Sequence, residues 1–203
     1  MPTIHMFRVI VLKAFLGGVL GIVLCATSAT AQSFRAHALL GLNAAQIDGD
    51  GLWGYNQGGI LGGVKVALPL SDILSVQAGM LYSAKGSRSS EQEGNLGMWR
   101  LAYLELPVEL EVRAFEKVYF FGGLSSNYLI RARSGFAGAL DNNRQGLRDF
   151  DFNYTLGVVY RFADNAGALL RASDALHSAS EFQHFRNRTL GFALVYYFSA
   201  ESE

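Results

Sequence analysis

The chain has 203 residues, of which 50% are hydrophobic and 12% aromatic, and its 17 basic residues balance 17 acidic ones. This balance leaves no basic footprint for nucleic acid, so a nucleic-acid partner is not expected. The 23 glycines, 14 phenylalanines and nine tyrosines accompany only three prolines, a mixture typical of strands and turns rather than helices.

The N-terminus has the features of an export signal. The first 13 residues contain two bases and no acid, and the apolar run 14–24 follows them. That run is shorter than the about 20 residues that a membrane-spanning helix needs. Small residues at 29–31 predict cleavage before Gln32. We therefore expect a signal peptide at residues 1–31 and one mature domain at residues 32–203.

The single cysteine, Cys25, lies inside this signal. Lipidation normally needs a small residue before the cysteine, and Leu24 stands there instead. Without Cys25 the mature chain offers neither a disulfide nor a thiolate nucleophile. Because the signal takes two of the 17 bases and none of the 17 acids, 15 bases remain and the net charge is near −2.

Alternation at period two marks the mature chain as a series of strands. Residues 104–113 show it most clearly, because Glu105, Glu109 and Glu111 share one face and aliphatic residues occupy the other. Each segment exceeds or approaches the about 9 to 11 residues that a tilted strand needs to cross a membrane. The predicted strands are approximately 34–46, 57–68, 73–86, 99–113, 117–133, 150–162, 167–175 and 187–198.

The connections between these strands alternate in length. Tight turns at 69–72, 114–116 and 163–166 contrast with long polar connections at 48–55, 87–98, 134–149 and 176–186. Short periplasmic turns opposite longer outer loops are typical of exported membrane barrels. No apolar run after the signal approaches about 20 residues, which argues against helical membrane spans.

Side-chain volume predicts which face is outside. A soluble, lipocalin-like barrel would turn its apolar face inward, but the face containing Phe150, Phe152 and Tyr154 is too bulky for the narrow interior of eight strands. The opposite face is small and polar, and an arginine facing mid-bilayer would cost about 2 to 4 kcal/mol. We therefore predict an all-β fold, an eight-stranded antiparallel up-and-down transmembrane β-barrel in the outer membrane.

The inward face contains charges of both signs in similar number. Charges in a narrow lumen must be paired, because an unpaired buried charge costs several kcal/mol. We favour a salt-bridge network that fills the lumen over an ion or solute path. Pro107 shares this face and predicts a β-bulge, because proline cannot donate to the ladder. The predicted lumen network comprises Arg35, Lys65, Glu105, Glu109, Glu111, Arg113, Arg131, Arg161 and Arg171.

Three short motifs resemble the landmarks of PorT-type outer membrane β-barrel proteins. They are YSAKG at 82–86, YLELP at 103–107, and the closing LGF and YYF within 190–198. The resemblance covers essentially the whole mature chain and implies an eight-stranded barrel in a Gram-negative outer membrane, in a family that mostly lacks a defined activity. The chain departs from many such barrels by continuing past its last aromatic, so Tyr196 and Phe198 are the expected assembly signal.

Residues 177–181 contain the types of a His, Ser and Glu hydrolase, but adjacent His177 and Ser178 on a strand would point to opposite faces. The lipid A deacylase pattern also expects serine where Ala179 stands. The stretch 48–51, Asp-Gly-Asp-Gly, lacks the further acids of a calcium loop and indicates a turn. His37 and His184 are isolated in sequence, so we expect no metal site and no cofactor.

Long loops are the remaining place for function. The loop 134–149 contains Arg144, Arg148, Asp141 and Asp149, and Trp53 and Tyr55 give the first loop aromatics that suit either a partner or the headgroup belt. The expected partners are outer membrane lipid, lipopolysaccharide and the assembly machinery, with an envelope protein as a further candidate. We predict a non-enzymatic barrel with a plugged lumen and a structural or loop-mediated interaction role. The alternatives are a narrow porin-like channel and, less favoured, a lipid-modifying hydrolase.

Overall fold

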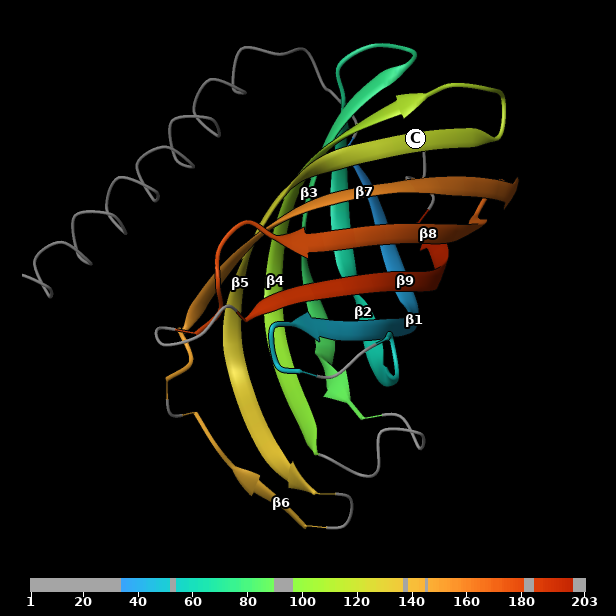
Figure 1. The fold of residues 1–203 in the computed structure, drawn as a ribbon. Coiled ribbons are helices and arrows are strands. Elements are labelled where there is room, and N and C mark those ends of the chain that lie inside the picture. The colour runs from blue at the N-terminus through green and yellow to red at the C-terminus, as the bar shows by residue number, and fades with distance from the viewer. Residues whose placement is uncertain are drawn as a thin grey trace, which may run out of the picture. The chain divides into compact units, whose positions relative to one another are not determined.

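The computed structural model describes residues 34–51, 54–89, 97–136, 139–144, 146–180 and 185–198. These residues form one antiparallel sheet of nine strands (Figure 1). Eight strands agree with the predicted segments to within three residues at either end. In this part of the chain no helix is long and apolar enough to cross a membrane. The strands are β1 (Arg35–Asp48), β2 (Gln57–Pro69), β3 (Leu74–Arg88), β4 (Met98–Arg113), β5 (Val118–Phe136), β6 (Ala139–Asn142), β7 (Phe150–Ala163), β8 (Ala166–Ala175) and β9 (Arg186–Tyr197).

Strand pairing closes the sheet into a barrel. The order around the wall is β1-β2-β3-β4-β5-β7-β8-β9, with β9 paired back to β1 and β4 paired to β5. Every neighbouring pair is antiparallel. Closure satisfies the backbone N–H and C=O groups that an open edge would expose to lipid. The predicted eight-stranded antiparallel barrel is therefore confirmed.

Side chains alternate between the inner and outer faces of the barrel strands. In β7, Asp151, Asn153 and Thr155 are buried, whereas Phe152 and Tyr154 are exposed. The exposed face of the other barrel strands likewise presents large apolar side chains. This is the reverse of a soluble protein, where such residues are mostly inside. An apolar outer wall suits hydrocarbon, as predicted from side-chain volume.

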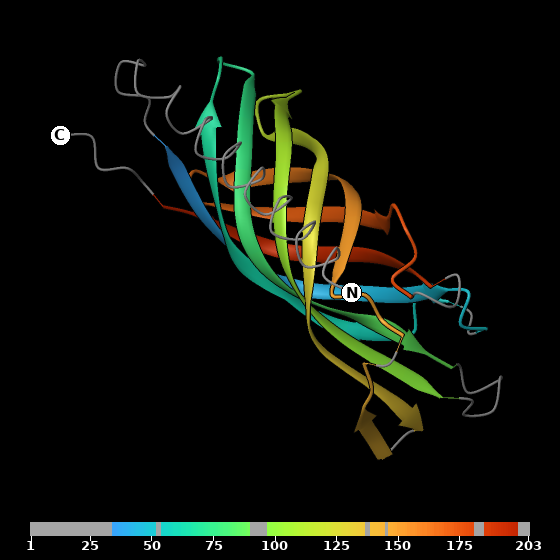
Figure 2. The same ribbon diagram turned by 90° about the vertical axis from the view of Figure 1, so that its left-hand side faces the viewer.

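The two ends of the barrel differ in the length of their connections. The turns 70–73, 114–117 and 164–165 lie at one end, and the long connections lie at the other. The strand β6 was predicted only as part of a loop, and it pairs with the loop end of β5. Figures 1 and 2 both show β6 at the end of the barrel opposite the tight turns. The turn end is the periplasmic end by the rule for exported barrels.

Two backbone features shape the wall. A Cβ on Gly41 would meet the carbonyl oxygen of Phe192, so only glycine allows this approach of β1 and β9. Pro107 is buried on the inner face, and the β3–β4 ladder is interrupted opposite it. The register shift of β4 against β5 lies instead between Ala102 and Tyr103. The bulge predicted at Pro107 is therefore wrong in position, although proline does interrupt one ladder.

Candidate functional site

Glu105 of β4 is the centre of the charge cluster in the lumen. Its Oε1 lies 2.7 Å from Lys85 Nζ of β3, and its Oε2 accepts a hydrogen bond of 2.9 Å from Arg171 Nη2 of β8. All three side chains are almost completely buried. One carboxylate thus binds two cations from different sides of the barrel, which gives charge-assisted hydrogen bonds in a water-poor interior.

A second ion pair lies further along the same strand. Glu109 Oε2 accepts hydrogen bonds from Lys65 Nζ at 2.6 Å and from Gln77 Nε2 at 3.1 Å. The ammonium of Lys65 also lies 4.9 Å from the ring centroid of Phe121, within the range of a cation–π contact. Both charged side chains are buried, so β2, β3 and β4 are joined through one polar unit.

The third pair closes the turn end of the lumen. Arg161 Nη2 lies 3.3 Å from Glu111 Oε1. The guanidinium carbon lies 3.9 Å and 4.2 Å from the ring centroids of Tyr119 and Tyr197, so the planar group is held between two aromatic rings. A polar pocket of about 300 Å³ opens here. Two further members of the predicted network, Arg35 and Arg113, are exposed at its rim and make no ion pair with the described residues.

Arg131 departs from the predicted network. Strict alternation from Asn127 and Leu129 places Arg131 inside, but its side chain is exposed. The cause is the register shift in β5: Tyr103 pairs with Leu129 whereas Ala102 pairs with Arg131, which leaves Ile130 as an extra residue. One extra residue reverses the face of everything after it. Arg131 therefore lies outside the barrel.

Two inward charges were missed by sequence reasoning. Lys85 alternates in phase with Gln77, so the same period that placed Gln77 inside would have found it. Asp151 is likewise in phase with Asn153. The amide of Asn187 donates from Nδ2 to Asp151 Oδ2 at 3.0 Å and to Tyr103 Oη at 3.1 Å. This amide of β9 therefore links a carboxylate of β7 to a phenol of β4.

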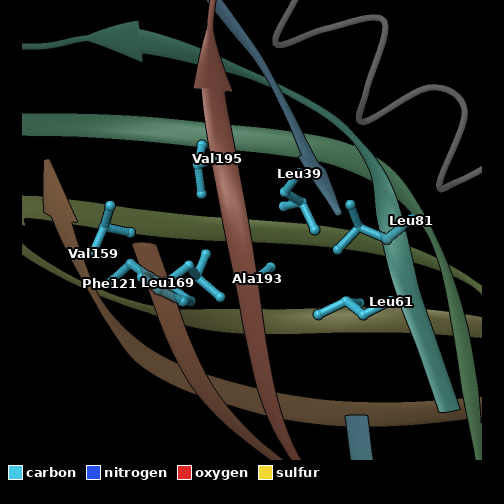
Figure 3. Close-up of a cluster of buried hydrophobic side chains, with 8 residues drawn as sticks. All are labelled: Leu39, Leu61, Leu81, Phe121, Val159, Leu169, Ala193 and Val195. Atoms are coloured by element: carbon cyan, nitrogen blue, oxygen red, sulfur yellow. The ribbon is translucent and has the colours of Figure 1, made fainter. Parts of the chain in front are cut away.

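The lumen also contains an apolar cluster, which corrects the expectation of a purely small and polar interior. Figure 3 shows eight buried hydrophobic side chains that converge from seven of the eight barrel strands. Their exposed fractions do not exceed 4%. Small inward residues elsewhere in the lumen leave room for these larger side chains. Close packing depends on the total side-chain volume in the lumen and not on the volume that each strand contributes. The cluster comprises Leu39, Leu61, Leu81, Phe121, Val159, Leu169, Ala193 and Val195.

A second apolar cluster lies at the loop end. Trp99 and Phe185 meet edge to face at 5.3 Å and pack with buried residues from several strands. The neighbouring connections are tied together, because Arg148 N donates to Ala179 O at 2.8 Å and Leu147 forms a β-bridge with Ser180. The core of this cluster is Ile47, Leu101, Tyr103, Leu129, Ala132 and Phe185.

Other predicted loop residues have structural contacts or stay exposed. Arg144 Nη2 donates to Leu129 O at 2.7 Å and pairs with Asp149 Oδ1 at 3.1 Å. Asp141 and Tyr55 are exposed. Trp53 lies outside the described residues. The loop end is therefore a surface stabilised by its own hydrogen bonds.

The hydrolase-like segment has no catalytic arrangement among its described residues. His177 is exposed. Ser178 Oγ accepts hydrogen bonds from the backbone N–H groups of Ser180 at 3.2 Å and Phe185 at 3.0 Å, so it shapes the loop. Glu181 and His184 lie outside the described residues. Within the part of the chain that the structure describes, no group of three metal-ligating side chains occurs.

His37, Tyr196 and Phe198 lie where β1 begins and β9 ends. His37 is buried inside the turn end of the barrel, where its ring lies 5.2 Å from that of Tyr197. The predicted assembly signal, Tyr196 and Phe198, is half exposed on the outer face, and the two rings meet edge to face at 5.4 Å. Both aromatics therefore lie where lipid or a partner can reach them.

A closed barrel with an apolar outer wall and a charged interior defines a transmembrane β-barrel protein of the outer membrane. The model of the outer membrane protein beta-barrel domain matches residues 30–181. The chain therefore belongs to this family, in which location in the outer membrane, with its lipid and lipopolysaccharide, is expected. No curated protein matches the chain.

Solved structures with the same fold differ widely in sequence. The crystal structure of Ail, the attachment invasion locus protein of Yersinia pestis, in complex with the heparin analogue sucrose octasulfate, has a TM-score of 0.53 at 14% identity, covering 82% of this chain and 99% of that chain. Another crystal structure of Ail has a TM-score of 0.53 at 15% identity, covering 81% of this chain and 98% of that chain. The crystal structure of Neisserial surface protein A has a TM-score of 0.49 at 10% identity, covering 81% of this chain and 97% of that chain. At 14% and 15% identity, the two Ail structures show the fold alone.

Proposed function

We propose that this chain is a non-enzymatic outer membrane barrel with a plugged lumen, which acts structurally or through its loop end. The observation that carries the proposal is the filled interior. Glu105 binds two buried cations, and an apolar cluster with at most 4% exposure occupies the same lumen. Ions would have to displace paired charges and packed hydrocarbon to pass.

The loop end supports an interaction role. The connection before β7 and the connection between β8 and β9 are joined through Arg148 and Ala179, and Arg144 is fixed by Leu129 and Asp149. Rigid scaffolds commonly present binding residues on such loops. An envelope protein is the proposed class of partner at this end, and the assembly machinery is the proposed reader of Tyr196 and Phe198.

Two finer assignments belong to the same proposal. A signal peptide at residues 1–31 and a mature barrel at residues 32–203 follow from the charge and hydropathy of the N-terminus. PorT-type membership within the family rests on the motifs at 82–86, 103–107 and 190–198. The first two motifs lie within β3 and β4, and the third ends one residue beyond β9. The first two contain Lys85 and Glu105, which form an ion pair at 2.7 Å.

Single-channel recording in planar bilayers tests the plugged lumen. The folded protein is expected to give no conductance steps, with an open porin in the same bilayer as the positive control. Reproducible steps from the unmutated protein would contradict the plug and favour the narrow channel. In that case the substitution Glu105→Gln would change ion selectivity, because Glu105 would line the path.

A further inference from the structure

Four arginines share the outer face of the barrel at the loop ends of β3, β4 and β5. Arg88, Arg100 and Arg131 are exposed and Arg133 is half-buried. Arg131 reaches this face only because of the extra residue at Ile130. We name these four residues the arginine patch. Its members come from adjacent strands of one wall, so they form a single cationic surface.

The register places two of these arginines directly against each other. Arg100 pairs across the ladder with Arg133, and Arg131 follows at the next outward position of β5. Directly opposed like charges destabilise a strand pair. None of the ion pairs among the described residues includes a member of the patch. Arg133 donates only to the neutral Oδ1 of Asn142, at 3.4 Å.

The opposite wall shows how the chain neutralises arginines at the same end. Arg186 and Arg188 of β9 also lie on the outer face, and both bind Asp174 of β8, at 3.4 Å and 3.2 Å. Arg188 also pairs with Asp48 of β1 at 3.3 Å. That wall supplies its own carboxylates. The patch differs because none of its four arginines forms an ion pair with a described carboxylate.

The depth of the patch follows from the residues next to it. Tyr82, Leu104, Tyr128 and Phe150 occupy one continuous row across β3, β4, β5 and β7, and three of the four are aromatic. Aromatic rows of this kind mark the interface between hydrocarbon and headgroups. Arg100 lies four residues beyond Leu104 toward the loop end, about 13 Å along a strand. The patch therefore lies at headgroup level in the outer leaflet.

We propose that the arginine patch binds the phosphate groups of lipopolysaccharide in the outer leaflet. Guanidinium groups bind phosphate through paired hydrogen bonds, and a phosphate between Arg100 and Arg133 would remove their repulsion. The four cations of the patch are opposite in sign to the phosphate groups of lipopolysaccharide. The proposal rests on the membrane location and is independent of whether the lumen conducts, so a failed plug would leave it intact.

Native mass spectrometry of the folded protein in detergent micelles tests the proposal, with phosphorylated lipid A and the same lipid A after removal of its phosphates as probes. The unmutated protein should bind the phosphorylated form roughly tenfold or more tightly, because hydrogen bonds between guanidinium and phosphate are charge-assisted. The double substitution Arg100→Gln and Arg133→Gln should abolish this preference. Equal binding of both lipids by the unmutated protein would overturn the proposal.

Matched variants distinguish the effect of the arginine patch on lipid A binding from the effect of the protein's net charge. Arg113→Gln with Lys117→Gln removes the same charge from exposed positions at the turn end and should keep the preference. Arg100→Lys with Arg133→Lys keeps the charge without the planar guanidinium and should bind phosphorylated lipid A at an intermediate level. This lysine pair also tests the proposal if the glutamine pair at the same positions fails to fold. An equal loss in both glutamine pairs would overturn the proposal, as would displacement of lipid A by an equal concentration of inorganic phosphate.

Discussion

Arg171 and Glu105 form a hydrogen-bonded ion pair of 2.9 Å across the lumen, although 66 positions separate them in the chain. Their strands, β8 and β4, are not neighbours: β5 and β7 lie between them by the shorter way around the barrel. The pair therefore braces two separated parts of the wall. Lys85 adds a third strand to the same carboxylate.

Removing the carboxylate charge should destabilise the barrel strongly. Glu105→Gln leaves Lys85 and Arg171 buried without an anion, and breaking a buried pair costs about 3 to 5 kcal/mol. Adding Glu109→Gln should increase the loss by orphaning Lys65. Urea unfolding of the refolded protein in micelles measures the free energy of unfolding. The control is Glu116→Gln, at an exposed position. An equal loss of unfolding free energy in Glu105→Gln and Glu116→Gln would contradict the role of Glu105.

Truncation inside the apolar cluster should cost more than truncation on the lipid face of the same strand. Leu169 is 2% exposed and Leu170 is 56% exposed. Leu169→Ala should lower the free energy of unfolding by about 2 to 5 kcal/mol, because a cavity is left in a packed interior. Leu170→Ala should cost clearly less under the same urea titration. If the order were reversed, the lumen would not be packed as described.

Gly41 should not accept even one methyl group. A Cβ there would meet the backbone of Phe192 and Ala193, so Gly41→Ala must push β1 and β9 apart, at about 1 to 3 kcal/mol. Gly58 is the matched control, because a Cβ at that position meets nothing within 4 Å. Folding yield and urea midpoint should fall only for Gly41→Ala. Equal values for both variants would show that the wall relaxes freely.

Ser178 should act on loop order rather than on catalysis. Ser178→Ala removes the acceptor for the N–H groups of Ser180 and Phe185, at about 1 kcal/mol for a net hydrogen bond. Hydrogen exchange at those two amides should become roughly fivefold faster, and exchange in the barrel strands should stay unchanged. A lipid deacylase activity in the unmutated protein, lost on His177→Ala, would instead support the hydrolase.

The sequence alone determined the strands, their inward and outward faces and the class of membrane protein. Residues 99–113 were expected and β4 spans Met98–Arg113, because alternation is a local property that any continuous strand must display. The face of Glu105, Glu109 and Glu111 follows from the same period. The apolar outer wall follows from side-chain volume in the same local way.

Only the tertiary structure decided which charges meet and where the period breaks. Glu105 binds Arg171 because of the stagger of strands around the barrel, which no single segment encodes. Ile130 shifts the register of β5 and turns Arg131 outward, although its neighbours carry no proline or glycine signal. Strand β6 has four residues inside a polar loop, too few for a period to be read. These features depend on how strands pair with one another, and a single segment read by itself does not reveal its pairing partner or its register.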